Sequence, residues 1–196
     1  MSNSNSTNTG ITEFLDSIYN PIISPEFHQN LNHDLSRRPF VTLTYAQSLD
    51  GKIAGVDGRQ LRLSGNQSMK MTHIMISNQD RQSLEEAGAR VIPITNGMNP
   101  SNQGLDLEKV FEVCKINGIN RLMIEGGSSI ISSCLNYTGD HPILNILVVT
   151  VSPYMVGEGL TVKTSNIDSR LSLLRHIQTK ILGSDAVFAY TSSNPE

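Results

Sequence analysis

The clearest candidate for binding chemistry is a short run of sequence, Glu-Gly-Gly-Ser-Ser, between a predicted strand and a predicted helix. Gly126 and Gly127 would let the backbone approach a ligand closely. The N–H groups of the helix start, with the hydroxyls of Ser128 and Ser129, would favour a phosphate group. Glu125 would face the same side. From these residues alone, however, an ordinary strand-to-helix turn with a serine cap is the more common interpretation.

A second candidate lies where a strand rich in Val, Thr, Phe and Tyr ends in small and polar residues. Ala46 and Ser48 would leave room for a flat ring against the backbone, and Asp50 could accept hydrogen bonds from nearby N–H groups. Equally, Asp50 and Gly51 could simply make a turn. A glycine-punctuated loop at residues 152–159 follows the longest apolar run, and it could either line a ligand or only reverse the chain.

Residue types that hold metals or act as nucleophiles do not have the spacing that such sites need. The five histidines show no metal-ligand spacing with one another or with the cysteines, so no metal site is predicted. Cys114 and Cys134 each continue an apolar helical face, which predicts small core residues rather than a disulfide or a thiol nucleophile. No Walker loop, nucleophile elbow or complete dinucleotide-binding glycine fingerprint is present. No catalytic side chain is assigned.

The composition is that of an ordinary soluble protein of 196 residues with 38% hydrophobic and 17% charged residues. We expect a disordered tail at residues 1–10, which are mostly Ser, Asn and Thr, and one domain over residues 11–196. No apolar run could span a bilayer, and no secretory or mitochondrial leader is visible, which predicts a cytoplasmic protein. A net charge of -3 without a basic stripe argues against nucleic-acid binding.

The predicted elements alternate between strands and helices through the middle of the chain, and strands follow one another at its end. This order predicts an α/β fold with a mixed, mainly parallel sheet flanked by helices and an antiparallel C-terminal hairpin. In such sheets ligands gather beyond the carboxyl ends of the strands. The expected helices cover 11–19, 79–87, 105–115 and 128–135, with a helical turn at 66–73, and the expected strands cover 39–47, 74–77, 90–94, 121–124, 143–151, 177–182 and 186–190.

Residues 38–54 read Arg-Pro-Phe-Val-Thr-Leu-Thr-Tyr-Ala-Gln-Ser-Leu-Asp-Gly-Lys-Ile-Ala. This segment resembles the opening strand and turn of the pyrimidine reductases of riboflavin biosynthesis, especially the stand-alone fungal and archaeal kind. Further similar segments follow in the family's order as far as about residue 190. They are Leu63-Ser64-Gly65, the Ser-Met-Lys-Met-Thr-His run at 68–73, Glu125-Gly126-Gly127, and Pro153 with Gly157 and Gly159.

The resemblance implies a dihydrofolate-reductase-like fold and a homodimer. It also implies reduction, by NADPH, of the ribosylamino group of 2,5-diamino-6-ribosylamino-4(3H)-pyrimidinone 5′-phosphate to a ribitylamino group. Hydride would pass from the nicotinamide to the sugar C1 of an imine-like form, and binding and orientation would supply most of the rate. The residues implied to bind the cofactor are Ala46, Gly126, Gly127, Ser128 and Ser129, and those implied on the substrate side are Ser48, Asp50 and Glu125.

The sequence departs from the family pattern after His73. Members of the family continue there through a Leu-Arg pair, a His-Asp and apolar strand, a Gly-x-Gly-Thr turn and an Asp-Asn-Pro loop. Here His73 runs directly into Ile74-Met75-Ile76-Ser77, which resembles a strand far downstream. Several dozen residues, and with them one or more strands of the sheet, are therefore expected to be missing. Two hypotheses follow: a working reductase, or a non-catalytic remnant with at most weak nucleotide binding.

Overall fold

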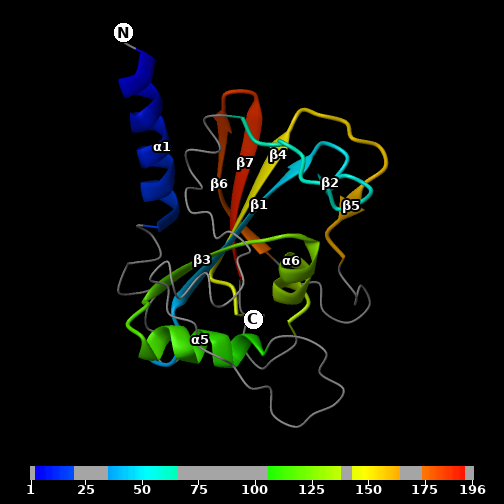
Figure 1. Cartoon of the computed structure of the whole chain (residues 1–196). Coiled ribbons are helices and arrows are strands. Elements are labelled where there is room, and N and C mark those ends of the chain that lie inside the picture. Colours follow the sequence, from blue (N-terminus) through cyan, green and yellow to red (C-terminus); the bar gives the residue numbers. More distant parts are fainter. Residues whose placement is uncertain (1–2, 20–34, 66–105, 138–142, 164–173, 193–196) are drawn as a thin grey trace, which may run out of the picture.

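The computed structural model describes residues 3–19, 35–65, 106–137, 143–163 and 174–192. Within these ranges seven strands form two sheets, one of five strands in the order β3-β1-β4-β7-β6 and one of two strands, β2 and β5 (Figure 1). The helices are α1 (Asn3–Tyr19), α5 (Leu107–Ile116) and α6 (Ser128–Leu135). The strands are β1 (Phe40–Ser48), β2 (Lys52–Ala54), β3 (Arg121–Glu125), β4 (Ile146–Ser152), β5 (Leu160–Thr161), β6 (Leu174–Leu182) and β7 (Asp185–Ser192).

The larger sheet combines parallel and antiparallel pairing. Strand β1 lies between β3 and β4 and runs parallel to both, whereas β7 runs antiparallel to β4 and to β6. Gly183 has a φ of 69°, the left-handed conformation that a tight turn between β6 and β7 requires. The predicted mixed sheet with a C-terminal hairpin is thereby confirmed.

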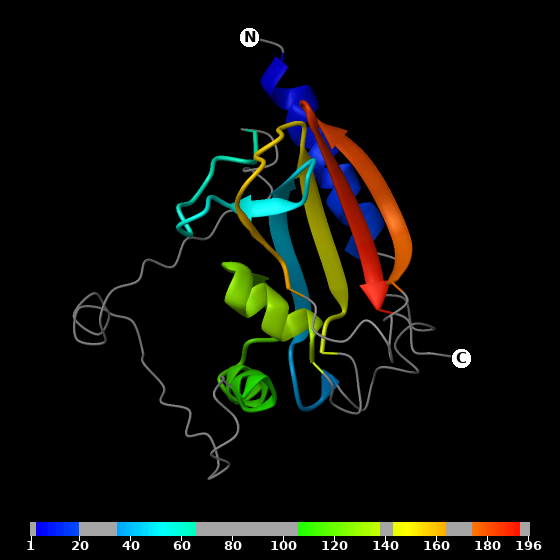
Figure 2. The same cartoon turned by 90° about the vertical axis from the view of Figure 1, so that its right-hand side faces the viewer.

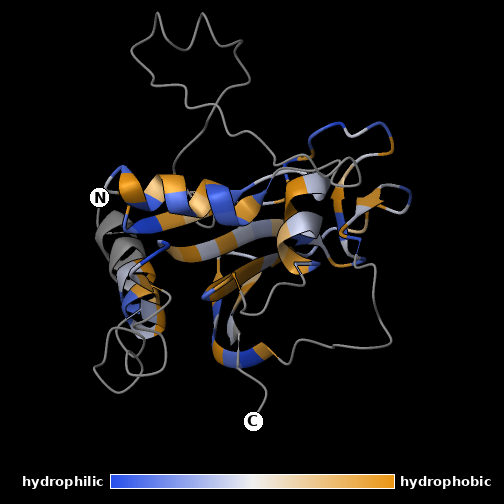
Figure 3. Ribbon diagram, turned by 90° about the horizontal axis from the view of Figure 1, so that it is seen from below, coloured by the Kyte–Doolittle hydropathy of each residue, from blue (hydrophilic) through white to orange (hydrophobic). Residues whose placement is uncertain are grey.

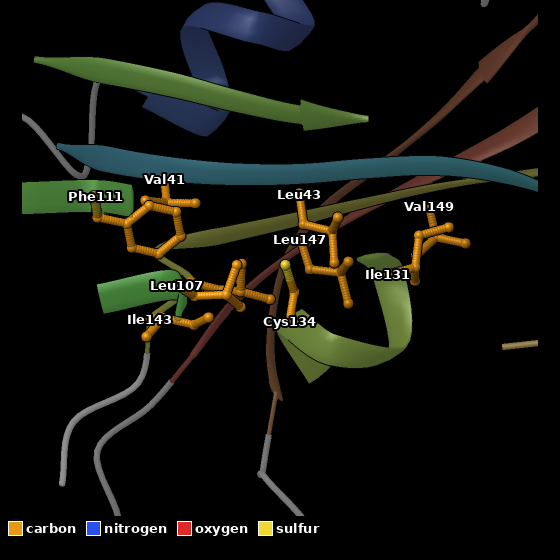
Figure 4. Packing of buried hydrophobic residues seen from close by; sticks show 10 residues of the cluster. Val41, Leu43, Leu107, Phe111, Ile131, Cys134, Ile143, Leu147 and Val149 are labelled. Carbon is orange, nitrogen blue, oxygen red and sulfur yellow. The ribbon is translucent and has the colours of Figure 1, made fainter. Parts of the chain in front are cut away.

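Helices cover both faces of this sheet, α1 on one face and α5 with α6 on the other (Figure 2). The two faces are sorted by alternation along the strands, because successive side chains of a strand point to opposite sides. The odd-numbered positions of β1 and β4 pack against α5 and α6 (Figure 4). This first core includes Val41, Leu43, Leu107, Phe111, Ile131, Cys134, Ile143, Leu147 and Val149.

The even-numbered positions of β4 belong to a second core, under α1. Burying Phe14 and Ile18 of α1 against this face shields the sheet from water, and Phe14 is only 2% exposed. Both α5 and α6 carry hydrophilic as well as hydrophobic residues, as expected of helices that bury one side (Figure 3). The second core consists of Ile11, Phe14, Ile18, Ile146, Val148, Leu182, Val187 and Ala189.

A buried polar cluster joins the amino ends of β1 and β4. The Arg38 guanidinium donates to the carbonyl of Ile143 at 3.0 Å and to the side-chain oxygen of Asn145 at 3.2 Å. That same oxygen accepts the backbone N–H of Val41 at 2.8 Å, and the Thr191 hydroxyl donates to the carbonyl of Asn145 at 3.0 Å. Buried polar groups are tolerated when they are hydrogen-bonded, and these bonds fix the two strands at that end.

The structure corrects one expectation and leaves others outside its described ranges. Helix α1 begins at Asn3, so most of the segment predicted as a disordered tail, residues 1–10, is helical. Extending an existing helix is much easier than starting one, and Phe14 and Ile18 anchor this helix on the sheet. The predicted helical turn, helix and strands between residues 66 and 94, and the His73 junction, lie outside the described residues.

Strand β3 forms one edge of the described sheet. Its side chains alternate between exposed and half-buried, and Met123 is 47% exposed. Leu122 and Ile124 pack only partly against the first core. In the described part of the chain, no helix is long and apolar enough to cross a membrane.

Candidate functional site at the carboxyl ends of the parallel strands

The two corners that the sequence singles out lie on neighbouring strands. In the parallel ladder Thr44 of β1 pairs with Glu125 of β3, so β3 ends beside the middle of β1, four residues before Ser48. On its other side β1 runs with β4 as far as the pair Ser48 and Ser152. The carboxyl ends of all three strands therefore meet at one edge of the sheet, the place where open α/β sheets bind ligands.

The turn from β3 to α6 requires glycine at its first position. A Cβ added to Gly126 would collide with the side chain of Ile130, whereas nothing lies within 4 Å of a Cβ added to Gly127. Gly127 is the N-cap of α6 and has no side chain with which to satisfy the first amides of the helix. Ser128 and Ser129 form the first turn, so amides and hydroxyls gather here as predicted.

Glu125 is the acidic group at this corner. Its side chain is exposed, but nearby protein removes part of the water around the carboxylate, and this desolvation raises the pKa of Glu125. Alternation along the paired strands puts Ala46 and Glu125 on the same face of the sheet, because parallel neighbours in register share their orientation. Ala46 is half-buried and carries only a methyl group.

The second corner is a cluster of hydrogen bonds around the Asp50 carboxylate. Asp50 Oδ1 accepts the hydroxyl of Ser48 at 2.5 Å and the backbone N–H of Val156 at 3.1 Å. Its Oδ2 accepts the N–H of Gly157 at 2.8 Å. These bonds, the Ser48 bond first, lower the pKa of Asp50 from 3.8 to about 2, because each stabilises the charged form.

Ser48 is fully buried and uses its hydroxyl twice. It donates to Asp50 and accepts the backbone N–H of Lys52 at 2.9 Å. Gly51, at a φ of 76°, makes the turn between them. Any direct ligand contact of Ser48 would therefore involve its backbone, while its hydroxyl shapes the turn.

A second pairing joins the same two loops. Strand β2 follows the turn after β1, and it pairs antiparallel with β5, which ends the loop after β4. The backbones are so close that a Cβ on Gly159 would come within 2.5 Å of the carbonyl oxygen of Ala54. Neither of these short strands was predicted from the sequence. Their only signal was Gly159 itself.

Sequence reasoning also did not identify the amide donors at Val156 and Gly157. They lie more than 100 residues from Asp50, and a backbone N–H carries no sequence signature. The loop at 152–159 was only a candidate ligand loop. Gly157 adopts a φ of 78°, which explains the glycine at that position.

Comparison with known proteins gives named relatives, although no family model matches the chain. The 2,5-diamino-6-ribosylamino-4(3H)-pyrimidinone 5′-phosphate reductase of Debaryomyces hansenii is 25% identical over 223 residues, covering 74% of this chain and 87% of that protein. The protein of the same name from Candida glabrata is 47% identical over 53 residues, which cover 26% of this chain and 22% of that protein.

Solved structures agree on the fold. The riboflavin biosynthesis reductase Rib7 of Saccharomyces cerevisiae aligns with a TM-score of 0.52 at 19% identity, covering 87% of this chain and 98% of that one. A diaminohydroxyphosphoribosylaminopyrimidine deaminase/reductase of Thermotoga maritima aligns with a TM-score of 0.59 at 17% identity, covering 86% of this chain. The match spans 60% of the Thermotoga chain.

The alignment with the Debaryomyces protein also shows that this chain is shortened. It runs over 223 positions, many more than 74% of a 196-residue chain can fill. Gaps of several dozen positions therefore fall within this chain, as its sequence predicts. The chain is thus a shortened relative of proteins named as pyrimidine reductases of riboflavin biosynthesis, and it shares the α/β fold of the solved reductase structures.

Proposed function

We propose that the chain is an NADPH-dependent reductase that converts the ribosylamino group of 2,5-diamino-6-ribosylamino-4(3H)-pyrimidinone 5′-phosphate to a ribitylamino group. The observation that carries this proposal is the meeting of two corners at one sheet edge: the amide-rich start of α6 and the end of β1. Relatives of the chain are named as reductases of this pyrimidine phosphate.

The residues present at this edge fit a nicotinamide nucleotide. Gly127 offers open space at the start of α6, so a phosphate could approach its first-turn amides closely. Ala46 leaves room for a flat ring beside β1. We assign cofactor binding to Ala46, Gly126, Gly127, Ser128 and Ser129. On the substrate side we place Glu125 as a contact, and Ser48 and Asp50 as residues that shape the loop beside the substrate.

The chemistry asked of the chain is mainly binding and orientation, because NADPH itself supplies the hydride. Holding two reactants at reacting distance replaces a bimolecular encounter and can supply most of the rate. Partial desolvation raises the pKa of Glu125, the acid that we place on the substrate side. No described side chain is assigned a covalent role.

Turnover is the direct test. With NADPH and the pyrimidine phosphate both saturating, absorbance at the nicotinamide band should fall only when the substrate is present. A ribitylamino product of the expected mass should accumulate at the same rate as the nicotinamide absorbance falls. Absence of turnover under these conditions would reject the proposal for this chain.

The shortening favours a second candidate, a non-catalytic remnant that binds nucleotide weakly. The two candidates differ in how strongly NADPH stabilises the fold. An active enzyme at a hundredfold excess of NADPH over its Kd gains about 2.7 kcal/mol, which raises Tm by several degrees. A remnant would show little shift, and it would lack a cooperative thermal transition if its core were incomplete.

By analogy with the family, we also propose that the chain acts as a homodimer in the cytoplasm. Sedimentation equilibrium should give twice the chain mass of 21.5 kDa. A monomer at micromolar concentration would contradict the dimer without bearing on turnover.

A further inference from the structure

The parallel strands β1 and β4 are tied together beyond the last pair of their ladder. The ladder ends at Ser48 and Ser152, where parallel strands usually diverge into separate loops. Here the Leu49 N–H donates to the carbonyl of Tyr154 at 2.8 Å, which continues the connection by one residue. The Asp50 carboxylate then accepts the N–H groups of Val156 and Gly157.

We infer that Asp50 is a positioning residue, a clasp between the loop after β1 and the loop after β4, rather than a direct ligand of substrate. Its three acceptor contacts go to Ser48, Val156 and Gly157, all within the chain. The inference rests on the proposed function, because the loops so fixed lie at the edge where cofactor and substrate would meet.

The charge of Asp50 matters to this clasp as much as its shape. Hydrogen bonds from amides to a carboxylate are roughly twice as strong as those between neutral groups. An asparagine has nearly the same shape, but it offers only one acceptor oxygen. Its NH2 group would face one of the two backbone N–H donors, with which it cannot form a hydrogen bond. Two amides that converge on one side chain from the opposite loop therefore require the ionised acid.

The clasp also sets the path of β2. The Ser48 hydroxyl accepts the Lys52 amide while it donates to Asp50, so the turn and the clasp share one hydrogen-bond chain. Strand β2 then meets β5 at the far end of the loop that the clasp holds. A loosened clasp would let residues 154–157 move relative to Ala46, and misplacement of about 1 Å can cost a hundredfold in rate.

The test begins with a readout that does not depend on activity. In Asp50→Asn, hydrogen exchange of the Val156 and Gly157 amides should accelerate at least tenfold, while the buried amides of Val148 and Val149 in β4 keep their protection. Asp57→Asn, an exposed acid in the neighbouring loop, is the matched control and should leave both sets unchanged. Unchanged exchange at 156 and 157 in Asp50→Asn would overturn the clasp.

The second readout is kinetic. A positioning role predicts that Asp50→Asn lowers kcat at least tenfold and changes KM for the pyrimidine phosphate less than threefold. A direct substrate ligand would instead raise KM, and that result, or an unchanged kcat, would overturn the inference. If Asp50→Asn fails to fold, Ser48→Ala, which removes one donor and keeps the charge, should show the same pattern at smaller size.

These readouts separate the two ideas. If the parent chain shows no turnover, the proposed function fails, and hydrogen exchange still decides whether Asp50 holds the two loops. If the parent chain reduces the pyrimidine phosphate but hydrogen exchange of the Val156 and Gly157 amides is unchanged in Asp50→Asn, the proposed function is supported and the role of Asp50 as a clasp is rejected.

Discussion

Gly126 shows how a single residue type can be dictated by packing rather than by flexibility. Its position directly after β3 leaves no volume for a side chain, because Ile130 of α6 already fills that space. The following residue, Gly127, has open space around it. The two glycines of this motif therefore serve different purposes. The missing side chain of Gly126 lets α6 pack on the sheet, and that of Gly127 leaves the start of the helix accessible.

Substitution of the two glycines should separate these reasons. Gly126→Ala should destabilise the fold by about 1–3 kcal/mol, the usual cost of overpacking. Gly127→Ala should cost less than about 1 kcal/mol, since it changes only the cap. Urea unfolding measures both, and Ile130→Ala should rescue Gly126→Ala in the double variant. Equal losses for the two alanines would contradict this account.

The carboxylate of Asp50 should contribute to acid sensitivity. Its pKa is lowered from 3.8 to about 2, so its stabilising contribution is present above pH 3.8 and is lost as pH falls through about 2. Stability of the parent should therefore decline across this window more steeply than that of Asp50→Asn. Urea unfolding at pH 5, 3 and 2 measures the difference, and parallel curves would count against it.

At the scale of elements, the sequence predicts well wherever local pattern and burial agree. Helix α6 spans the predicted residues 128–135, and β1, β3 and α5 deviate by only one or two residues at their ends. The β2–β5 pairing was missed because three- and two-residue strands are too short for alternation to register. Their partners are also more than 100 residues apart, which no local pattern reports.

The candidate site, too, was predictable from the sequence only in part. The turn at 125–129 and the strand end at 46–50 were predictable, because glycines, serines and an acid after strands are visible in the sequence. The clasp was not, because its donors are backbone amides of a distant loop. The roles of these residues in binding stay predictions until ligands are tested.

Helix α1 should contribute strongly to stability even though it precedes the motifs that resemble those of the reductases. Phe14→Ala should cost about 3–5 kcal/mol, because the ring fills a buried space beside Ile146 and Val187. Asp16→Ala, on the exposed side of the same helix, is the control and should stay within about 0.5 kcal/mol. Guanidinium unfolding compares them, and a small effect of Phe14→Ala would show that α1 is only loosely docked.

At the scale of the whole molecule, the fold is recognisable although the chain is shortened. Two solved reductase structures align with TM-scores of 0.52 and 0.59, while gaps of several dozen positions fall within this chain in the alignment with the Debaryomyces protein. Among the described residues, β3 forms one edge of the sheet and carries partly exposed apolar side chains.

Restoring the block should raise the activity that we propose for this chain. Inserting the corresponding segment of the Debaryomyces protein between His73 and Ile74 should raise kcat/KM at least a hundredfold, since the family resemblance implies that the segment carries a Gly-x-Gly-Thr turn that helps to orient the reactants. A scrambled segment of equal length is the control. An insertion that leaves kcat/KM at the parent value would show that the block is dispensable to this chain.

The placement of α1 has a practical consequence for anyone who trims this protein. The motifs that resemble the reductases start near residue 38, and a boundary drawn there would discard the helix that shields the back of β4, β6 and β7. Val187 and Ala189, now fully enclosed, would face solvent. The shorter protein would expose an apolar face of the sheet and precipitate, although all the motifs that resemble the enzymes had been kept.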